Sequence, residues 1–237
     1  MKKLAIVPAF NEERAIGAVI DEIRAFDPTF DVLVVDDGSH DRTAEAALRH
    51  GARVVRLPFN LGIGGSVQTG FRYAFDHGYE LVARVDGDGQ HDPAQLGALL
   101  PAVLGGEADI CVGSRFAGAA GYRSSGARRI GIRILARTVS LLTGQRVTDT
   151  TSGFQVLDRK AIELFAQDYP HDYPEVEAAV MLHKHRLRLA EVPVSMRERV
   201  HGNSSITALR SVYYMAKVLL AVLVGMFRRR ATPVEDA

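Results

Sequence analysis

The sequence has a single cysteine, and its charges almost cancel. Because Cys111 is alone, no disulfide can form within the chain, and its place in the apolar run DICVG favours a buried structural thiol. The 29 Lys and Arg residues balance 28 Asp and Glu residues, which leaves a formal charge of +1. This composition fits a reducing cytoplasm and gives no electrostatic reason to expect a nucleic-acid partner.

Long apolar runs are also absent. Residues 218–227 form an apolar stretch only about half as long as a membrane span requires, and Arg210 and Lys217 interrupt its extension upstream. The N-terminal segment MKKLAIVPAFNEE has two lysines but only a short apolar run ended by Pro8, which is too little for a signal peptide. With neither a membrane span nor a signal peptide, we expect the protein to be cytoplasmic.

The histidines show no zinc spacing and no Ser-His-Asp arrangement.

A repeating pattern of strands and helices fills most of the chain, and 47% hydrophobic residues supply ample material for a core. Helical patterns alternate with the strands; Asn11 is expected to cap the first helix, and Asp92 with Pro93 opens another. This alternation predicts an α/β fold with a mostly parallel central sheet and helices on both faces. Short aliphatic runs predict its buried strands at residues 4–7, 32–35, 53–57, 81–85 and 110–112.

Polar clusters follow four of these predicted strands directly. PAFNEE follows the first, DDGS the second, DGDGQHD the fourth and GSRF the fifth. In open α/β sheets, ligands bind in the crevice at the carboxyl ends of the strands. The four clusters are therefore expected to converge on one site.

The acidic segment RVDGDGQHDP is a candidate metal site. Asp86 and Asp88 flank one glycine at the end of an apolar strand, so both carboxylates can face the same point outside the sheet. Such oxygen ligands suit Mg²⁺ or Mn²⁺, and Gln90 would add a further oxygen, with His91 supporting the loop. The alternative is an ordinary Asp-Gly turn, and Asp92 is expected to cap the next helix rather than to bind metal.

Two other motifs each allow two interpretations. In VVDDGSHDRT, one carboxylate of Asp36 and Asp37 would bond to a base or ribose while the other shapes the turn, and capping by Ser39 or Asp41 explains part of the motif. NLGIGGSVQTG does not fit a dinucleotide-binding pattern, because Val67 stands where Gly or Ala is required, and no lysine follows to make a P-loop. Its glycines indicate close backbone approach to a ligand or, preferably, to a packed helix.

Beyond residue 120 the pattern becomes basic and amphipathic. Arg129, Arg133 and Arg137 recur at four-residue spacing within a predicted helix of residues 128–142. This helix either faces a membrane or presents a solvated charged face while it packs on its own core. Another helix is expected at residues 174–185, followed by a strand at 189–196.

The C-terminal segment is predicted to form an interfacial helix. Residues 206–230 combine an apolar run with Arg228–Arg230, which would lie near acidic lipid headgroups if the helix lies in the membrane interface. The alternative is packing on a partner, such as a separate membrane subunit. Residues 231–237 form a polar tail, and residues 1–205 are expected to be one domain.

Taken in order, VPAFNEE, VVDDGSHDRT, NLGIGGSVQTG, VDGDGQHDP, GSRF, DTTSGFQ and RVHGNSS resemble the family 2 glycosyltransferases of the GT-A fold. Within that family, the dolichyl- or polyprenyl-phosphate sugar synthases are the most similar. The resemblance covers residues 4 to about 205. It implies a nucleotide-diphosphate-sugar donor, a divalent metal ion, inversion at the anomeric carbon and a lipid-phosphate acceptor at the membrane.

The resemblance also assigns roles by position. Asp86 and Asp88 match the metal motif, with Gln90 as a third ligand. Arg115 and Arg199 match arginines that hold donor or acceptor phosphates, a role that suits guanidinium geometry. The residues that would line the nucleotide are Pro8, Phe10, Glu12, Val35 and Asp37.

Weaker assignments concern the acceptor. Asp149 and Ser152 would lie near the reacting sugar, and Arg128 and Arg129 would guide the lipid phosphate. The family usually has a lysine where this chain has Ser205, so one phosphate contact of the family is expected to be missing.

The resulting expectation is an inverting, metal-dependent transferase that moves a hexose or N-acetylhexosamine to a polyprenyl phosphate at the cytoplasmic face of the membrane. One alternative is the same donor chemistry with a soluble or polysaccharide acceptor. Another is a catalytically silent scaffold or sugar-nucleotide sensor. The motifs determine neither the sugar nor the base, although a uridine donor is preferred.

Overall fold

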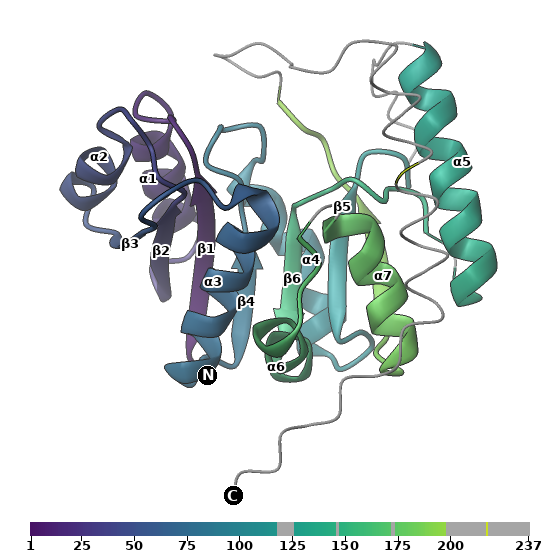
Figure 1. Ribbon diagram of the computed structural model, residues 1–237. Coiled ribbons are helices and arrows are strands. Elements are labelled where there is room, and N and C mark those ends of the chain that lie inside the picture. The colour runs from purple at the N-terminus through teal and green to yellow at the C-terminus, as the bar shows by residue number, and fades with distance from the viewer. Residues whose placement is uncertain (118–125, 146, 172–173, 198–216, 218–237) are drawn as a thin grey trace, which may run out of the picture.

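The computed structural model describes residues 1–117, 126–145, 147–171, 174–197 and 217, with the backbone alone for residues 126–133. Its centre is a seven-stranded sheet in the order β3-β2-β1-β4-β6-β5-β7 (Figure 1). The strands are β1 (Lys3–Ala9), β2 (Phe30–Asp36), β3 (Arg53–Arg56), β4 (Leu81–Arg84), β5 (Ile110–Ser114), β6 (Gln155–Asp158) and β7 (Leu189–Pro193).

Helices cover both faces of this sheet. Helices α3, α6 and α7 lie on the front face in Figure 1, and α1, α2 and α4 lie behind it, while α5 packs on the outer side of α7. The bounds are α1 (Ile16–Phe26), α2 (Thr43–Arg49), α3 (Gly62–Asp76), a 3₁₀ turn (Pro93–Gln95) leading into α4 (Leu96–Leu104), α5 (Gly126–Thr143), α6 (Arg159–Gln167) and α7 (Pro174–Lys184).

Strands β1, β2, β4 and β5 are apolar along nearly their whole length because they are buried on both faces. Leu4 and Ile6 of β1 pack with α3 and α6, whereas Ala5 and Val7 pack with α1 and α4. A strand with helices on both sides has no solvent-facing row, so it lacks the alternation of polar and apolar residues that marks a half-exposed strand. This arrangement confirms the predicted α/β fold and its five expected N-terminal strands.

The sheet is mostly parallel, as expected, but β6 runs against it. β6 pairs antiparallel with both β4 and β5, while β1, β2, β3 and β4 pair in parallel, as do β5 and β7. Since β6 is reversed, its amino end lies at the edge where the parallel strands have their carboxyl ends. The loop of residues 149–154 is thereby brought to that edge.

The expected cap of the first helix is wrong. Helix α1 begins only at Ile16, and Asn11 adopts a left-handed backbone conformation with φ of 57°. The Asn11 side chain instead accepts a hydrogen bond from the backbone of His40 at 2.9 Å. Asparagine tolerates this conformation better than most residues, so Asn11 serves the turn rather than the helix. The Asp92 prediction is confirmed, because its carboxylate accepts from the backbone of Ala94.

The glycines of NLGIGGSVQTG lie in α3, where two of them allow close packing. A Cβ atom at Gly64 would lie 2.6 Å from the carbonyl oxygen of Pro170, and one at Gly70 would lie 2.4 Å from a methyl group of Ile6. Both separations are far below van der Waals contact. The preferred packing interpretation of these glycines is therefore confirmed at these two positions.

The predicted C-terminal helix of residues 206–230 and the tail of residues 231–237 lie outside the described residues. In the part of the chain that the structure does describe, no helix has both the length and the apolar character needed to cross a membrane.

Gly70→Ala is expected to destabilise the protein, because the added methyl group has no room between α3 and β1. Overpacking of this kind costs about 1–3 kcal/mol, while the better helix propensity of alanine returns at most about 1 kcal/mol. Urea unfolding measures the difference. Gly97→Ala in α4 is the matched control, since its nearest foreign atom would be at 3.7 Å. Equal stability of the two variants would contradict the tight packing at Gly70.

Candidate active site

The acidic loop, residues 85–92, lies at the point where the order of the strands in the sheet reverses. β1 has β2 on one side and β4 on the other, so the connections that follow β1 and β4 leave towards opposite sides. The backbone of Gly87 donates to Pro8 O at 3.1 Å, and a Cβ atom at Gly87 would lie 3.1 Å from Ala9 Cβ. The loops after the two strands therefore begin in contact at this switch point, the usual place for a ligand in such sheets.

Asp86 is surrounded by groups that favour its charged form. The Oδ1 atom lies 3.4 Å from Arg84 Nε, and the Oδ2 atom lies 3.7 Å from His91 Nε2. Burial alone would raise the pKa of Asp86, but the charge of Arg84, with a smaller contribution from Arg115, brings that pKa below its ordinary value. Asp86 is therefore a carboxylate at neutral pH.

His91 supports this loop from inside. The ring is buried against Phe154, with 5.0 Å between the ring centroids, and Nδ1 accepts a hydrogen bond from the backbone of Asp86 at 3.0 Å. Burial lowers the pKa of His91 below its ordinary value. A neutral ring whose Nδ1 is an acceptor carries its proton on Nε2, on the side that faces the Asp86 carboxylate. His91 therefore orients Asp86, which agrees with the supporting role expected for it.

Asp88 and Gln90 complete the loop beyond Asp86. The Asp88 carboxylate accepts from the backbone of Gln90 at 3.0 Å, and Gln90 O accepts from the backbone of Arg197 at 2.9 Å. Among the described residues, no group of three His, Cys, Asp or Glu side chains could hold a metal ion. A cation here would take its remaining ligands from water and from a ligand's phosphates, as Mg²⁺ often does.

The residues present fit such a cation. Asp86 Oδ1 is buried and has no hydrogen-bond partner among the described residues, so one carboxylate oxygen is left for a further interaction. Oxygen donors from two carboxylates and an amide suit Mg²⁺ or Mn²⁺ rather than zinc.

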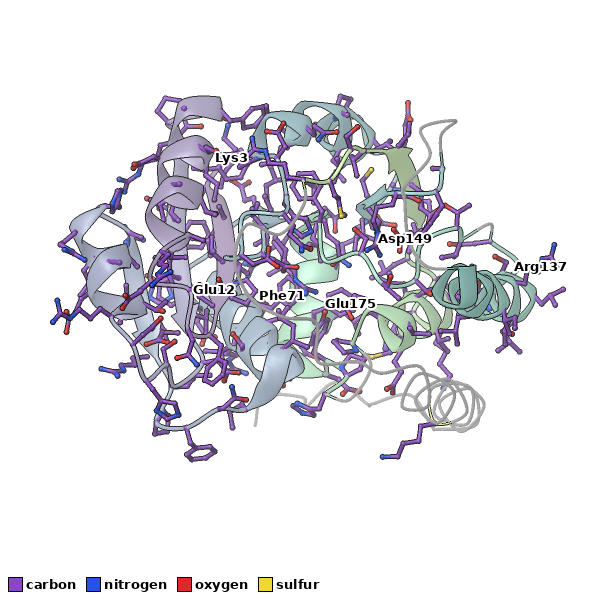
Figure 2. All side chains as sticks on the ribbon, turned by 90° about the horizontal axis from the view of Figure 1, so that it is seen from above. Lys3, Glu12, Phe71, Arg137, Asp149 and Glu175 are labelled. Atoms are coloured by element: carbon purple, nitrogen blue, oxygen red, sulfur yellow. The ribbon has the colours of Figure 1, made fainter. Side chains whose placement is uncertain are left out.

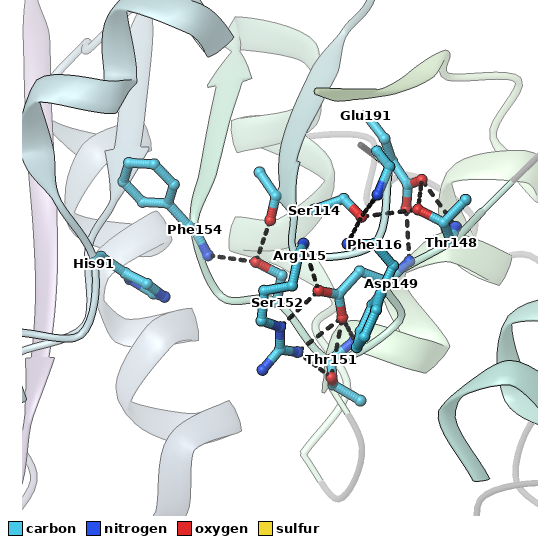
Figure 3. Close-up of polar contacts among 12 residues, drawn as sticks. His91, Ser114, Arg115, Phe116, Thr148, Asp149, Thr151, Ser152, Phe154 and Glu191 are labelled. Atoms are coloured by element: carbon cyan, nitrogen blue, oxygen red, sulfur yellow. Dashed lines mark hydrogen bonds and ion pairs between the residues drawn. The ribbon is translucent and has the colours of Figure 1, made fainter. Parts of the chain in front are cut away.

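Arg115 and Asp149 form a bidentate ion pair next to the acidic loop (Figure 3). Arg115 Nε and Nη2 donate to the two oxygens of Asp149 at 2.7 and 2.8 Å, and the backbone of Arg115 donates at 3.1 Å. Thr151 accepts from the same guanidinium and donates to Asp149. Burial would raise the pKa of Asp149, but the hydrogen bonds and charge of Arg115 bring it below its ordinary value. The sequence placed both residues in the site, and the structure pairs them.

Glu191 of β7 fixes the loop that carries Asp149. Its carboxylate accepts from the backbone of Thr148, from the Thr148 hydroxyl at 2.7 Å and from the backbone of Asp149 at 3.0 Å (Figure 3). Sequence reasoning missed this residue. The available signal was a lone acid inside the strand-like run LAEVPVSM, where a charge is unusual unless it has a partner.

Ser152 is placed differently from its prediction. The residue is buried, its hydroxyl donates to Gly113 O at 2.6 Å, and it accepts from the backbone of Phe154. Because these bonds join β5 to the start of β6, Ser152 holds the sheet edge together and has no exposed surface for an acceptor phosphate.

The loops after β1 and β2 are hydrogen-bonded to each other on the other side of the switch point. The backbone of Asn11 donates a hydrogen bond to Ser39 Oγ, and its side chain accepts one from the backbone of His40. The backbone of Glu12 donates to Thr43 Oγ1 at 2.8 Å. Phe10 is exposed and meets the His40 ring edge-on at 6.2 Å between centroids. Pro8 thus contacts the acidic loop through its carbonyl group, while Phe10 and Glu12 lie in the segment that is bonded to residues 39–43.

Val35 and Asp37 have structural roles in the fold. The Val35 side chain is fully buried in the core. The Asp37 carboxylate accepts from the backbones of Leu61 and Gly62 at 2.7 and 3.0 Å, which satisfies the amino end of α3, and burial raises its pKa. Both side chains are thus buried within the fold, and their contact with a nucleotide stays a prediction.

Arg84 and Glu175 were not anticipated from the sequence either. Arg84 is 1% exposed and donates to Glu175 Oε1 of α7 at 2.9 Å. The signal for Arg84 was a charged residue inside the aliphatic run LVARV.

The predicted phosphate ligands Arg128, Arg129 and Arg199 lie outside the described side chains, as does Ser205.

Comparison with known proteins gives a consistent picture. A family model described as "Glycosyl transferase family 2" matches residues 4–165. The chain is 30% identical to an undecaprenyl-phosphate mannosyltransferase of Micrococcus luteus, over 87% of this chain and 88% of that protein. It is also 30% identical to a polyprenol monophosphomannose synthase of Mycolicibacterium smegmatis, over 92% and 85%.

A solved structure shares the fold. The glucosyl-3-phosphoglycerate synthase of Mycobacterium tuberculosis, crystallised with Mn²⁺, UDP and glucosyl-3-phosphoglycerate, superposes with a TM-score of 0.72 at 21% identity, over 97% of this chain and 81% of that chain. This likeness confirms the expected GT-A fold.

Asp149→Asn is expected to lower the free energy of unfolding at pH 7 by about 3–5 kcal/mol, because it leaves the Arg115 charge without its buried partner. Asp149 has a lowered pKa in the folded protein, so its contribution is complete above the unfolded-state value of about 3.9 and is lost as the pH falls through the folded value. The gap between wild type and variant should therefore shrink below about pH 4 in urea unfolding experiments.

Asp76→Asn is the control for this measurement, since Asp76 pairs with Arg72 in an exposed i,i+4 arrangement. Such surface pairs contribute at most about 1 kcal/mol. A gap for Asp149→Asn that did not change with pH would contradict the assigned charge state.

Proposed function

The chain belongs to glycosyl transferase family 2, and from this we propose that it transfers a sugar from a nucleotide-diphosphate sugar to a polyprenyl phosphate, with a divalent cation at Asp86 and Asp88. The observation that carries the proposal is the placement of these two carboxylates at the switch point between β1 and β4. Two relatives named for polyprenyl phosphates, which align with 87% and 92% of the chain, support the acceptor class.

Each side chain around the acidic loop has a distinct role in this proposal. Asp86 and Asp88 would hold Mg²⁺ or Mn²⁺, with Gln90 as a further ligand, and the bound ion would neutralise charge on the diphosphate. His91 fixes the orientation of Asp86 through its backbone and carboxylate. Pro8, Phe10 and Glu12 line the nucleotide side, where Phe10 offers an exposed aromatic face.

Arg115 contributes a fixed positive charge beside the loop. Because Asp149 and Thr151 hold two of its donors, the guanidinium cannot swing freely, and its field reaches Asp86. A positive charge that is already oriented stabilises a departing diphosphate without reorganisation during the reaction. Glu191 acts one step further out by fixing the loop of Thr148 and Asp149.

The acceptor needs little activation. A phosphate monoester has a second pKa of about 6, so the lipid phosphate is largely a dianion at neutral pH. One of its oxygens forms the new bond to the anomeric carbon while the bond to the diphosphate oxygen breaks, and the nucleoside diphosphate leaves. Inversion at carbon follows from this single displacement, and positioning matters more than a general base.

Helix α5 supports the membrane side of the proposal. Ile134 and Leu141 are 43% and 85% exposed, and Arg137 lies on the outer side of the helix in Figure 2. An exposed apolar pair with a basic residue between them suits the interface of an anionic membrane. We place the protein peripherally at the cytoplasmic face, with Arg128 and Arg129 of the same helix as guides for the lipid phosphate and Arg199 as a further phosphate ligand.

A soluble acceptor is the second candidate. The solved structure that shares this fold belongs to an enzyme named for glucosyl-3-phosphoglycerate, a small phosphorylated acid. The same donor site would then serve an acceptor that needs no membrane.

Asp88→Asn is expected to lower turnover by at least about a hundredfold while the fold is retained, because a ligand of the cation loses its charge. Transfer of labelled sugar to a short polyprenyl phosphate with Mn²⁺ measures this. Asp92→Asn in the same loop is the control, since asparagine caps a helix as well as aspartate does and turnover should stay near wild type. Full activity of Asp88→Asn would refute the metal assignment.

The full-length protein is expected to prefer a lipid acceptor. A panel of nucleotide sugars is first screened by thermal shift with Mn²⁺, with UDP-sugars expected to stabilise most, and the best donor is then offered polyprenyl phosphate or 3-phosphoglycerate. We expect kcat/KM to be at least about tenfold higher for the lipid, a difference of about 1.4 kcal/mol. The reverse preference would favour the soluble acceptor.

A further inference from the structure

Arg84 is a fully buried cation in the middle of the molecule. It ends β4 directly behind the acidic loop, and only 1% of its side chain is exposed. Glu175 Oε1 of α7 lies 2.9 Å from Nη2, and the Tyr169 hydroxyl lies 3.4 Å from Nη1. Figure 2 shows Glu175 between the sheet and α5 in the view from above. A charge in such a place is tolerated only with opposite charge around it.

The contact between Arg84 and Asp86 is close but makes no hydrogen bond. Arg84 Nε and Asp86 Oδ1 are 3.4 Å apart, and both atoms are buried with no hydrogen-bond partner in the described part of the chain. In the neighbouring pair, by contrast, Arg115 reaches Asp149 at 2.7 and 2.8 Å. Asp86 is thus attracted by Arg84 without being tied to it.

Gly153 keeps this pair in place. A Cβ atom at residue 153 would lie 2.7 Å from Arg84 Nη2 and 2.9 Å from Asp86 Oδ2. The backbone of residue 153 therefore packs directly over both groups. Because the guanidinium is enclosed on this side and held by Glu175 on another, it cannot move away when the carboxylate turns towards a cation.

We propose that Arg84 is a positioning residue that competes with the divalent cation for Asp86, and that Glu175 sets how strongly it competes. The inference rests on the proposed metal site and extends it to a residue on α7. Glu175 offsets much of the Arg84 charge, so Asp86 can turn its oxygen towards the cation at a small cost. Without the Glu175 charge, the full positive charge of Arg84 would act on Asp86 and on the cation beside it.

The position of Glu175 links this balance to the outer helices. Glu175 is in the first turn of α7, and the following residues Val176, Ala179 and Val180 pack against Leu135 and Val139 of α5. Any shift of α7 along its axis would change the separation of Glu175 and Arg84. Glu175 is thus carried by a helix that packs on α5, the helix that we assign to the membrane side.

Titration of the full-length protein with Mn²⁺ in the presence of UDP tests the inference, with free Mn²⁺ followed by electron paramagnetic resonance. Glu175→Gln is expected to raise the Kd for Mn²⁺ about tenfold, in the range that one neighbouring charge imposes on a partly buried group. Glu175→Asp retains the charge and should stay within about threefold of wild type, a difference below about 0.7 kcal/mol. Asp76→Asn, in an exposed pair far from the loop, should leave the Kd unchanged.

The double variant Arg84→Met with Glu175→Gln separates charge from packing. It removes both charges while keeping the side-chain volume, a replacement that buried ion pairs often tolerate. Its Kd should return to the wild-type value or below, because nothing then competes for Asp86. If Glu175→Gln alone does not fold, the comparison of Glu175→Asp with the double variant decides, and the double variant must bind at least as tightly.

Two results would overturn the proposal. A folded Glu175→Gln protein with the wild-type Kd would remove the role of Glu175, and a weaker double variant would remove the competition by Arg84. A wild-type protein that binds no Mn²⁺ with UDP present would instead overturn the metal site itself, and this inference with it.

Discussion

The need to neutralise buried charge organises the carboxyl edge of the sheet. Most of these groups are largely removed from water, so each buried ion requires a partner of opposite charge or a set of backbone donors. Arg84 finds Glu175, Asp149 finds Arg115, and Asp37 finds the amino end of α3. Each of these interactions joins segments that are distant in the sequence, so satisfying the charges also fixes how the elements around the site are arranged.

The same pairs divide the acidic residues into two groups. Asp37 and Asp149 are held by several hydrogen bonds each and serve the frame of the site. Asp86 is oriented by His91 and attracted by Arg84, yet one of its oxygens has no hydrogen bond within the described residues. A carboxylate that is charged, positioned and still able to accept a ligand suits the divalent cation that we propose for this loop.

The strands and their polar ends could be predicted because each depends on a local pattern. Aliphatic runs without alternation marked strands buried on both faces, and the acids that followed them marked the binding edge. The reversal of β6 could not be predicted, because the apolar pattern of a short strand such as QVLD carries no information about its direction, and only its partners β4 and β5 set its orientation. Asn11 was misread for a similar reason: its side chain bonds to His40, which lies 29 positions away.

The sequence by itself determined the residue types, their order along the chain and the edge at which the clusters meet. It therefore sufficed to predict that Asp86, Asp88 and Arg115 lie at one edge, whereas Asp149 was assigned through the resemblance to a family. The tertiary structure decided which of these charges are paired within the protein, as with Arg115 and Asp149. It also brought Arg84, Glu175 and Glu191 next to these residues. Arg84 and Glu175 are 91 positions apart, and no local pattern relates them. Their partnership arises only when folding buries Arg84 and brings the Glu175 carboxylate within hydrogen-bonding distance of it.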